Sequence, residues 1–399
     1  MRLGRRPGVQ VEGRISPSLA ARLAYVAVFG AVGASIPYLS VYYGSLGLGL
    51  DAVGLLSSLA ACIGLVGSPL WGVVADRLAG SRLVMPGAAI LGAAAATALA
   101  LVRGPIPVVA AVAVMSLAMA GLIPILDARA LETVRGDRDR YSQLRVWGSA
   151  SFIVVVWLTG ALVERAGIAS MFAIYVPALL ASAVVTVPLR GEAAIAPPLP
   201  RLTGIGLVLR QPPLARFLVA ALIVWSASTA INWFFSLHLL AIGAPGEVVG
   251  AAWALGALVE IPIMWAYPAI ASRVGTERLL VAGAVALALR AATISFVDDP
   301  LLVTLTMALH GIGFALMLVG GVTYVARHAP PATAATAQGI LSATVFGLAL
   351  VIGPGLGGLA AGAWGLPTMF VLATLIGSVA LVAMVLALSR RRVPVEAVS

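Results

Sequence analysis

The sequence contains few charged residues and no lysine. Asp, Glu, Lys and Arg make up only 10% of the 399 residues, and all 25 basic residues are arginines. A single cysteine, Cys62, excludes an internal disulfide and any site built from several cysteines. The three histidines, His238, His310 and His328, lack the close spacing typical of metal ligands. We therefore expect no metal centre in this protein.

The chain also lacks the Gly-Lys-Ser/Thr phosphate-binding pattern, so no ATP site is expected. A glycine-rich run at residues 353–358 lies inside an apolar segment, where it favours close helix packing with a kink at its proline. We expect neither a cofactor nor enzymatic activity. The alternative, an integral membrane enzyme, would have only Glu260 and His310 as a weak catalytic dyad.

Long apolar segments make up most of the chain. Hydrophobic residues account for 61% of the sequence, and its mean hydropathy is +1.07. Segments of about 20 apolar residues cross a bilayer as helices, so the sequence predicts an all-α membrane protein with twelve transmembrane helices. The predicted spans are residues 18–43, 51–74, 83–102, 106–134, 141–163, 168–189, 213–241, 246–270, 279–297, 301–325, 334–361 and 366–388.

The arginines are distributed unevenly over the loops. If the N-terminus is inside, twenty arginines lie in inside segments or beside them, and two, Arg103 and Arg165, lie outside. Arginine and lysine collect on the cytoplasmic side of membrane proteins, so we expect a multi-pass protein of the plasma (inner) membrane with both termini cytoplasmic. The basic excess then matches anionic lipid, and no nucleic acid is expected as a partner.

An internal repeat relates the two halves of the chain at a constant offset of 196 residues. The pairs are Gly47 with Gly243, Asp51 with Glu247, Gly54 with Gly250, Arg77 with Arg273, and Arg82 with Arg278. The segment 190–212 is rich in proline and arginine, as linkers often are. We predict an N-terminal half at 1–189, a cytoplasmic linker at 190–212 and a C-terminal half at 213–399. Parallel halves of this kind enclose a substrate site near the membrane midplane.

The segment 72–82 resembles the loop between helices two and three of the major facilitator superfamily, although Gly80 comes one position later than in the family pattern. The resemblance implies the major facilitator fold, with two pseudo-symmetric six-helix halves. It also implies a gating loop that latches a neighbouring helix. The residues of this predicted loop and its repeat are Asp76, Arg77, Arg82, Arg273 and Arg278. The alternative interpretation is an ordinary solvated turn.

Asp127 and Arg145 stand out because most of the chain avoids charge. Ionisable groups near bilayer depth are costly unless they are paired or wetted, so both residues are candidates for a functional site. The alternative is that both lie at wetted helix ends and form a structural gate pair.

Short motifs across nearly the whole chain, such as residues 260–262 and 309–311, resemble the branch of lactose-permease-like and phenylpropionate-permease-like proton symporters. In lactose permeases, a carboxylate on helix four and an arginine on helix five hold the sugar. The 18-residue separation of Asp127 and Arg145 is similar to that pair. Phe152 falls where those permeases have a tryptophan that stacks on the sugar, and a phenyl ring can also stack.

Further aromatic and polar side chains are expected to line the cavity. Tyr38, Trp147 and the pair Asn232 and Trp233 complete the predicted binding site together with Phe152. The alternative for a tyrosine or tryptophan near a span end is an anchor at the membrane interface.

Glu260, Arg290 and His310 are predicted at similar depth near the midplane on three consecutive spans. Burial favours the neutral form of a carboxyl group and a nearby arginine favours its ionised form, so moving Arg290 relative to Glu260 would switch proton release. His310 can donate or accept a proton near neutral pH. The alternatives are a static buried pair and a histidine that only fills its hydrogen bonds. Lactose permeases carry the proton on a glutamate at the position of Gly313, so Glu260 would take over that role here.

Together these features predict a proton-coupled symporter that works by alternating access. The expected solute is a small polar or aromatic molecule: a sugar, a nucleoside or an aromatic carboxylate. An efflux antiporter for drugs or sugars would use the same fold with the opposite coupling, and a non-transporting sensor would need an output domain. The expected partners are the solute, protons and membrane lipid, and the protein is expected to act as a monomer.

Overall fold

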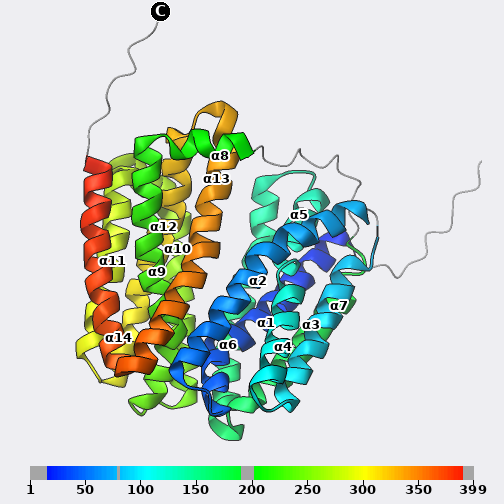
Figure 1. The fold of residues 1–399 in the computed structure, drawn as a ribbon. Coiled ribbons are helices and arrows are strands. Elements are labelled where there is room, and N and C mark those ends of the chain that lie inside the picture. The colour runs from blue at the N-terminus through cyan, green and yellow to red at the C-terminus, as the bar shows by residue number, and fades with distance from the viewer. Residues whose placement is uncertain (1–15, 79–80, 190–201, 390–399) are drawn as a thin grey trace, which may run out of the picture.

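The computed structural model describes residues 16–78, 81–189 and 202–389, and these segments are helical almost throughout (Figure 1). The first group of helices comprises α1 (Pro17–Ser45), α2 (Leu50–Arg77), α3 (Val84–Leu101), α4 (Pro105–Met119), α5 (Leu122–Thr133), α6 (Arg138–Ala166), the 3₁₀ turn η1 (Ile168–Met171) and α7 (Phe172–Val185). The described residues contain no strand.

The second group begins with the short α8 (Leu202–Leu209), which lies across one end of the molecule (Figure 1). It continues with α9 (Pro212–Ala241), α10 (Gly246–Val274), α11 (Thr276–Phe296), α12 (Pro300–His328), η2 (Pro331–Thr333), α13 (Ala334–Ala343), the π-helical turn η3 (Thr344–Leu348) and α14 (Ala349–Ser389). Gly365 has φ of 82° and breaks α14 into two limbs, 349–364 and 366–389. A positive φ is easily adopted only by glycine, so this residue makes the sharp turn possible.

Local sequence signals set several helix ends. The Ser16 side chain accepts a hydrogen bond from the Leu19 N–H at the start of α1, and Asp137 and Asp299 cap α6 and α12 in the same way. Such caps satisfy backbone N–H groups that have no partner within the helix. Gly167 ends α6 and Gly275 ends α10, both with positive φ.

Eleven helical stretches within the described residues are long and apolar enough to cross a membrane. The last of them, at residues 331–388, contains both limbs of α14 and is long enough for two spans, so the described residues agree with the twelve predicted spans. The predicted span 106–134 is nevertheless broken between α4 and α5. Trp71 of α2 presses against Gly121 at the break, and its Nε1–H donates to the Leu117 carbonyl at 2.6 Å. This break sets the direction of the helix that carries Asp127.

Two close seams join the first group of helices to the second. In one, α2 packs on the first limb of α14, where a Cβ on Gly54 would lie 2.6 Å from Gly358 Cα. In the other, α6 packs on α10, where a Cβ on Gly160 would lie 3.2 Å from Gly250 Cα. Small residues let helix backbones approach this closely.

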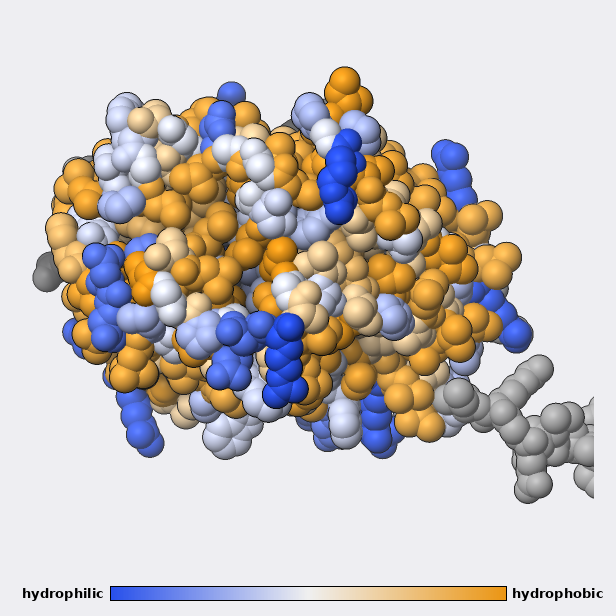
Figure 2. Space-filling model, turned by 90° about the horizontal axis from the view of Figure 1, so that it is seen from below, coloured by the Kyte–Doolittle hydropathy of each residue, from blue (hydrophilic) through white to orange (hydrophobic). Residues whose placement is uncertain are grey.

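Both seams lie near the end opposite α8, since Gly54 and Gly250 belong to the first turns of α2 and α10 (Figure 1). Viewed from that end, hydrophilic side chains stand at separate points among apolar ones (Figure 2). The two groups of helices are therefore held together most closely at this end.

The predicted linker 190–212 is only partly described, because residues 190–201 lie outside the described residues. Within this predicted linker, residues 202–209 form the helix α8. Leu207 and Leu209 of α8 are exposed, whereas Val208 is buried against α9 and its neighbours. The boundaries of the two halves at 189 and 213 stay predictions.

Candidate functional site

Asp127 lies on α5, beyond the break at Gly121, and faces α1. The Tyr25 hydroxyl of α1 donates a hydrogen bond to Asp127 Oδ1 at 2.6 Å. Tyr141, in the first turn of α6, lies near enough to interact with both groups. A short hydrogen bond to a carboxylate is strong, so Tyr25 fixes the position of the Asp127 carboxylate.

Arg145, two turns into α6, lies beside this carboxylate. Its Nε is 3.9 Å from Asp127 Oδ1, and its guanidinium lies 4.0 Å from the centre of the Phe29 ring. A guanidinium over an aromatic face gains a cation–π attraction without using its N–H donors. The side chains of Arg145 and Asp127 are 34% and 35% exposed. The pair is therefore loose and wetted, with donors free to reach a solute.

Glu260 of α10 lies in the second group of helices. It is half-buried, and Arg145 is near enough for its charge to influence Glu260. Gly311 of α12 packs against the Glu260 backbone, since a Cβ there would lie 3.2 Å from Glu260 N. Asp127 and Arg145 of the first group of helices and Glu260 of the second are therefore near one another, and we call these three residues the row of charges.

Arg290 forms no ion pair with Glu260 among the described residues, so the alternative of a static buried pair is not seen in this structure, and the role of both residues in proton coupling stays a prediction. Arg290 is 1% exposed, and its Nη1 donates to Asn232 Oδ1 at 2.6 Å. Its Nη2 contacts Met307 Sδ at 3.3 Å, and the guanidinium lies 5.2 Å from the centre of the Phe235 ring. The ion pairs found in the described residues do not include Glu260 with Arg290. The Arg290 side chain instead contacts residues of α9 and α12.

His310 of α12 is the second member of this buried cluster. It is 8% exposed, lies within reach of the charge of Arg290, and its ring centre is 5.7 Å from that of Phe314. Its Nδ1 has no hydrogen-bond partner among the described residues. Gly256, one turn before Glu260, packs against the imidazole. Arg290 and His310 are therefore together, while Glu260 lies on the neighbouring helix and points elsewhere.

Tyr38 and Trp147 lie away from Asp127 and Arg145, and their role in solute binding stays a prediction. Tyr38 is 1% exposed, and its hydroxyl donates to the Val156 carbonyl at 2.7 Å in the seam between α6 and α10. Trp147 is 47% exposed and shares a face of α6 with the exposed Val154 and Leu158. Two residues turn a helix by about 200°, so Trp147 points away from Arg145 toward the surroundings of the protein.

Three further predicted residues are closer to the row of charges or to the buried cluster. Phe152 shares a face of α6 with Arg145, two turns away, and is half-buried. Asn232 holds Arg290, so its side-chain oxygen is already occupied. Trp233 follows it on α9, and the buried Nε1–H of Trp233 has no partner among the described residues. A buried donor without a partner is unusual in a folded protein, and the role of Trp233 in solute binding stays a prediction.

The predicted gating residues lie at the α8 end. Asp76, in the last turn of α2, lines a cavity of about 140 Å³ together with Arg129 and Glu132 of α5. Arg77, Arg82, Arg273 and Arg278 occupy the adjoining ends of α2, α3, α10 and α11. The described ion pairs involve none of these five predicted residues. Arg129 is 7% exposed and pairs with Glu132 at 3.4 Å.

Sequence reasoning missed Tyr25, Arg129 and Glu164. Glu164 Oε2 of α6 accepts a hydrogen bond of 2.5 Å from the Gly246 N–H at the start of α10, so it links the two groups of helices. Tyr25 lies 102 residues from the aspartate it contacts, and no spacing rule connects them. Arg129 was counted only as a cytoplasmic arginine, and its burial was the signal that the sequence could not show.

The chain matches the model of the MFS_1 like family over residues 19–372. It is similar to a protein named maltose permease from Geobacillus stearothermophilus, at 29% identity over 329 residues, which cover 82% of this chain and 83% of that protein. A protein named uncharacterized transporter YwbF from Bacillus subtilis is 23% identical over 322 residues, which cover 78% of this chain and 79% of that protein.

Solved structures support the same fold. The nucleoside transporter NupG superposes with a TM-score of 0.83 at 18% identity, covering 94% of this chain and 100% of that structure. A bacterial homologue of the lysosomal transporter Spinster, described as inward-facing, superposes with a TM-score of 0.74 at 13% identity, covering 93% of this chain and 96% of that structure. The chain therefore has the twelve-helix fold of these transporters.

Proposed function

From the premise that this chain belongs to the MFS_1 like family, and so to the major facilitator superfamily transporters, we propose that it couples a proton to the uptake of a small neutral polar solute, a sugar or a nucleoside. The observation that carries this proposal is the row formed by Asp127, Arg145 and Glu260. One wetted guanidinium lies 3.9 Å from the carboxylate of Asp127 in its own group of helices, and its charge reaches Glu260 of the other group.

The charges of this row favour a neutral solute. A carboxylate-bearing solute would compete with Asp127 and Glu260 for Arg145, and the other central cation, Arg290, is buried with its own partners. Hydroxyl groups, in contrast, can donate to Asp127 and accept from Arg145 without bringing in further charge. The half-buried Phe152 offers a face for a sugar or a base. The maltose permease and the nucleoside transporter among the similar proteins support both solute classes, and an aromatic carboxylate fits less well.

Proton coupling follows from the competition for Arg145. While Glu260 is ionised, Arg145 is attracted toward α10, and when Glu260 is protonated the guanidinium is free to serve Asp127 and the solute. Binding of the solute and protonation of Glu260 then favour each other, which is the thermodynamic condition for symport. Arg290 and His310 would supply a fixed polar surface next to α10, with His310 as a further proton acceptor.

We also propose an orientation and a resting state. The arginine distribution supports a cytoplasmic location of the α8 end and both termini, in the plasma (inner) membrane. The seams at Gly54 and Gly250 close the opposite end, so the resting protein would open to the cytoplasm. Its function as a monomer would need only the two groups of helices within one chain.

The experiment uses proteoliposomes with an imposed pH gradient and labelled maltose or labelled uridine outside. The wild-type protein should accumulate at least one of them, and Glu260→Gln should abolish accumulation while solute exchange persists, because exchange needs no net proton movement. The matched control is Glu247→Gln, an exposed carboxylate in the first turn of the same helix. Accumulation by Glu260→Gln at the wild-type level would refute the role of Glu260, and accumulation driven only by the reversed gradient would indicate efflux antiport.

A further inference from the structure

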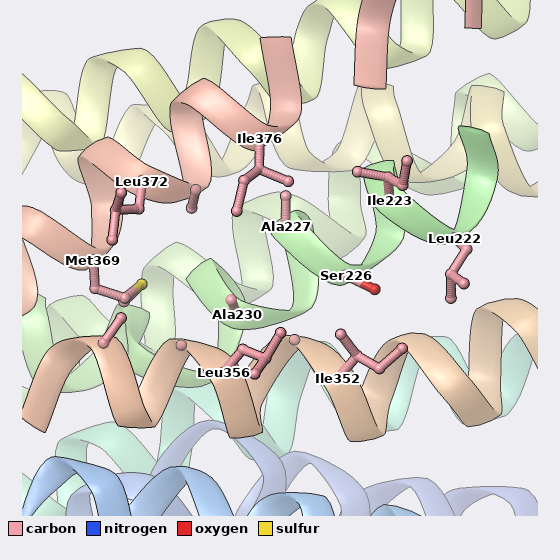
Figure 3. Close-up of a pocket in the computed structure, with 14 residues that line it drawn as sticks. Leu222, Ile223, Ser226, Ala227, Ala230, Ile352, Leu356, Met369, Leu372 and Ile376 are labelled. Carbon is pink, nitrogen blue, oxygen red and sulfur yellow. The ribbon is translucent and has the colours of Figure 1, made fainter. Parts of the chain in front are cut away.

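A membrane-facing crevice lies between α9 and the two limbs of α14, away from the row of charges (Figure 3). Its volume is about 390 Å³. Ala227 and Ala230 of α9 form its floor, Ile352 and Leu356 belong to the first limb, and Met369 and Leu372 to the second. None of Asp127, Arg145 and Glu260 lines it. The crevice is therefore distinct from the proposed solute site.

The crevice opens onto the apolar outer surface of the helices. Leu356 and Ile376, at its rim, are 63% and 48% exposed, and every lining residue belongs to a stretch that is apolar enough to cross the membrane. Large exposed aliphatic side chains at this depth face hydrocarbon. A molecule that enters the crevice must therefore be dissolved in the membrane and must itself be largely apolar.

The Ser226 hydroxyl is the one polar side-chain group in the lining. Ser226 is 9% exposed, and its Oγ has no hydrogen-bond partner among the described residues. Figure 3 shows this oxygen pointing off α9 toward the limb of α14 that carries Ile352. Serines within helices usually bond a carbonyl of the preceding turn, and Ser226 does not.

Water is a poor occupant for this space. A buried water needs two to four polar partners, and apolar cavities of this size stay dry. The Ser226 backbone carbonyl already accepts a hydrogen bond from Thr229 Oγ1 at 3.1 Å, which leaves the hydroxyl as the main polar group in the lining. A pure hydrocarbon chain would fill the volume but would leave the hydroxyl unpaired, and buried polar groups are almost always paired.

We infer that the crevice binds an apolar, membrane-dissolved small molecule that carries a single hydroxyl or carbonyl group, and that this group hydrogen-bonds Ser226. The apolar body of the molecule packs on Ala227, Ala230 and the aliphatic side chains of both α14 limbs. The first limb also carries Gly358 in the seam with α2, so an occupant would hold that limb against α9. Binding here leaves the proposed solute site open, so the two ligands would not compete directly for one site.

The test uses an octanol that carries a photoreactive diazirine on its chain, with the full-length protein in lipid nanodiscs. After irradiation, peptide mass spectrometry should locate adducts on the lining residues, with Met369 and Leu372 among them. Ser226→Ala should lower this labelling about fivefold, the loss expected for one hydrogen bond of about 1 kcal/mol. Ala227→Phe should abolish it by filling the crevice. Ser378→Ala is the matched control, because this exposed serine lies on the second limb of α14 outside the lining.

Three results would overturn the inference. The first is equal labelling of wild type and Ser226→Ala, and the second is equal labelling by an octane diazirine without the hydroxyl, since both would mean that an acyl chain alone fills the space. The third is unchanged labelling in Ala227→Phe, which would mean that the adducts arise elsewhere. Ser226→Ala removes only an unpaired oxygen, so it should fold normally, as an unchanged thermal midpoint without the probe would verify.

Discussion

At the scale of single residues, Arg290 is the clearest case of a buried charge that depends on its neighbouring side chains for stabilisation. Its guanidinium is 1% exposed and is held by an amide oxygen, a thioether and an aromatic face, with no carboxylate partner in the described ion pairs. Removing one partner of a buried charge costs far more than replacing the whole group by an apolar residue. The Asn232 oxygen is therefore a structural requirement of Arg290, whatever else it binds.

We predict that Asn232→Leu lowers the free energy of unfolding by about 2–3 kcal/mol, because it removes a hydrogen bond to a buried charged group. Arg290→Met should cost less, and the double variant Asn232→Leu/Arg290→Met should recover most of the loss caused by Asn232→Leu. Thermal or denaturant unfolding of the purified proteins measures the three differences. Simple additivity of the two single effects would show that the contact contributes nothing.

At the same scale, Tyr25 holds the Asp127 carboxylate in one direction. Tyr25 holds one carboxylate oxygen at 2.6 Å, so the aspartate keeps its direction while Arg145 remains 3.9 Å away. A fixed acceptor beside a loosely held donor suits a solute with adjacent hydroxyl groups.

We predict that Tyr25→Phe raises the KM for the transported solute about tenfold with a smaller change in kcat, because the carboxylate loses the hydrogen bond that orients it. Initial rates of labelled solute entry into proteoliposomes give both constants. Tyr43→Phe is a suitable control, since Tyr43 is an equally buried tyrosine on the same helix. An equal rise of the KM in Tyr25→Phe and Tyr43→Phe would mean that the effect comes from the packing of α1.

At the scale of elements, the start of α10 is the notable junction. Glu164 of α6 accepts the Gly246 N–H, and a carboxylate at a helix N-terminus is further favoured by the helix dipole. A few residues on, Gly250 allows α10 to touch the backbone of α6 at Val156 and Trp157. These contacts join helices from the two groups, so they must separate whenever the protein opens at this end.

We predict that Glu164→Gln shifts the equilibrium toward the state that is open at this end, since the neutral amide is a weaker acceptor and loses about 1 kcal/mol. A cysteine at Val249, which is 1% exposed and directly precedes Gly250 of the seam, reports the change through faster reaction with a membrane-impermeant maleimide in a Cys62→Ser background. Glu247→Gln serves as the control on the same helix turn. Unchanged reactivity of the Val249→Cys reporter would exclude Glu164 as a closing contact.

At the scale of the whole molecule, the two seams and the twelve crossings describe a transporter closed at one end. The α2–α14 seam includes Ser58, whose Oγ donates to the Val351 carbonyl at 2.6 Å, and a Cβ on Gly355 would lie 3.4 Å from Ser58 Cβ. Toward the α8 end, Cβ atoms added at Gly72 and Gly339 would meet nothing within 4 Å. Alternating access requires these two ends of the interface to open in turn.

We predict that Ser58→Cys/Gly355→Cys in the Cys62→Ser background forms a disulfide under mild oxidation, because the separation is close to that of disulfide-linked Cβ atoms. Cross-linking should lower the transport rate by about tenfold or more, and reduction of the disulfide should restore the rate. The pair Gly72→Cys/Gly339→Cys should cross-link far less in the resting protein. Full transport by the cross-linked Ser58/Gly355 variant would contradict an opening of this seam.

The sequence by itself determined the membrane architecture of this protein. Twelve spans could be located because hydropathy over about 20 residues is a local property that no distant contact changes. The repeat at 196 residues and the motif around Asp76 were sufficient to recognise the superfamily. The structure places Asp127 and Arg145 3.9 Å apart, as the resemblance to lactose permeases suggests, and their role in solute binding stays a prediction.

Only the tertiary structure decided which charges face each other. The sequence placed Glu260 and Arg290 at similar depth, yet the Arg290 guanidinium bonds Asn232, and the charge that reaches Glu260 is that of Arg145. Each residue turns a helix by about 100°, and helices that are apolar on every side carry no periodic signal of which face is inward. The break at Gly121 likewise depends on Trp71 from another helix. That the Ser226 hydroxyl lacks a hydrogen-bond partner could also be seen only in the structure. Helix rotation is set by packing between segments distant in the chain, and this is why local pattern could find the spans but not the pairs.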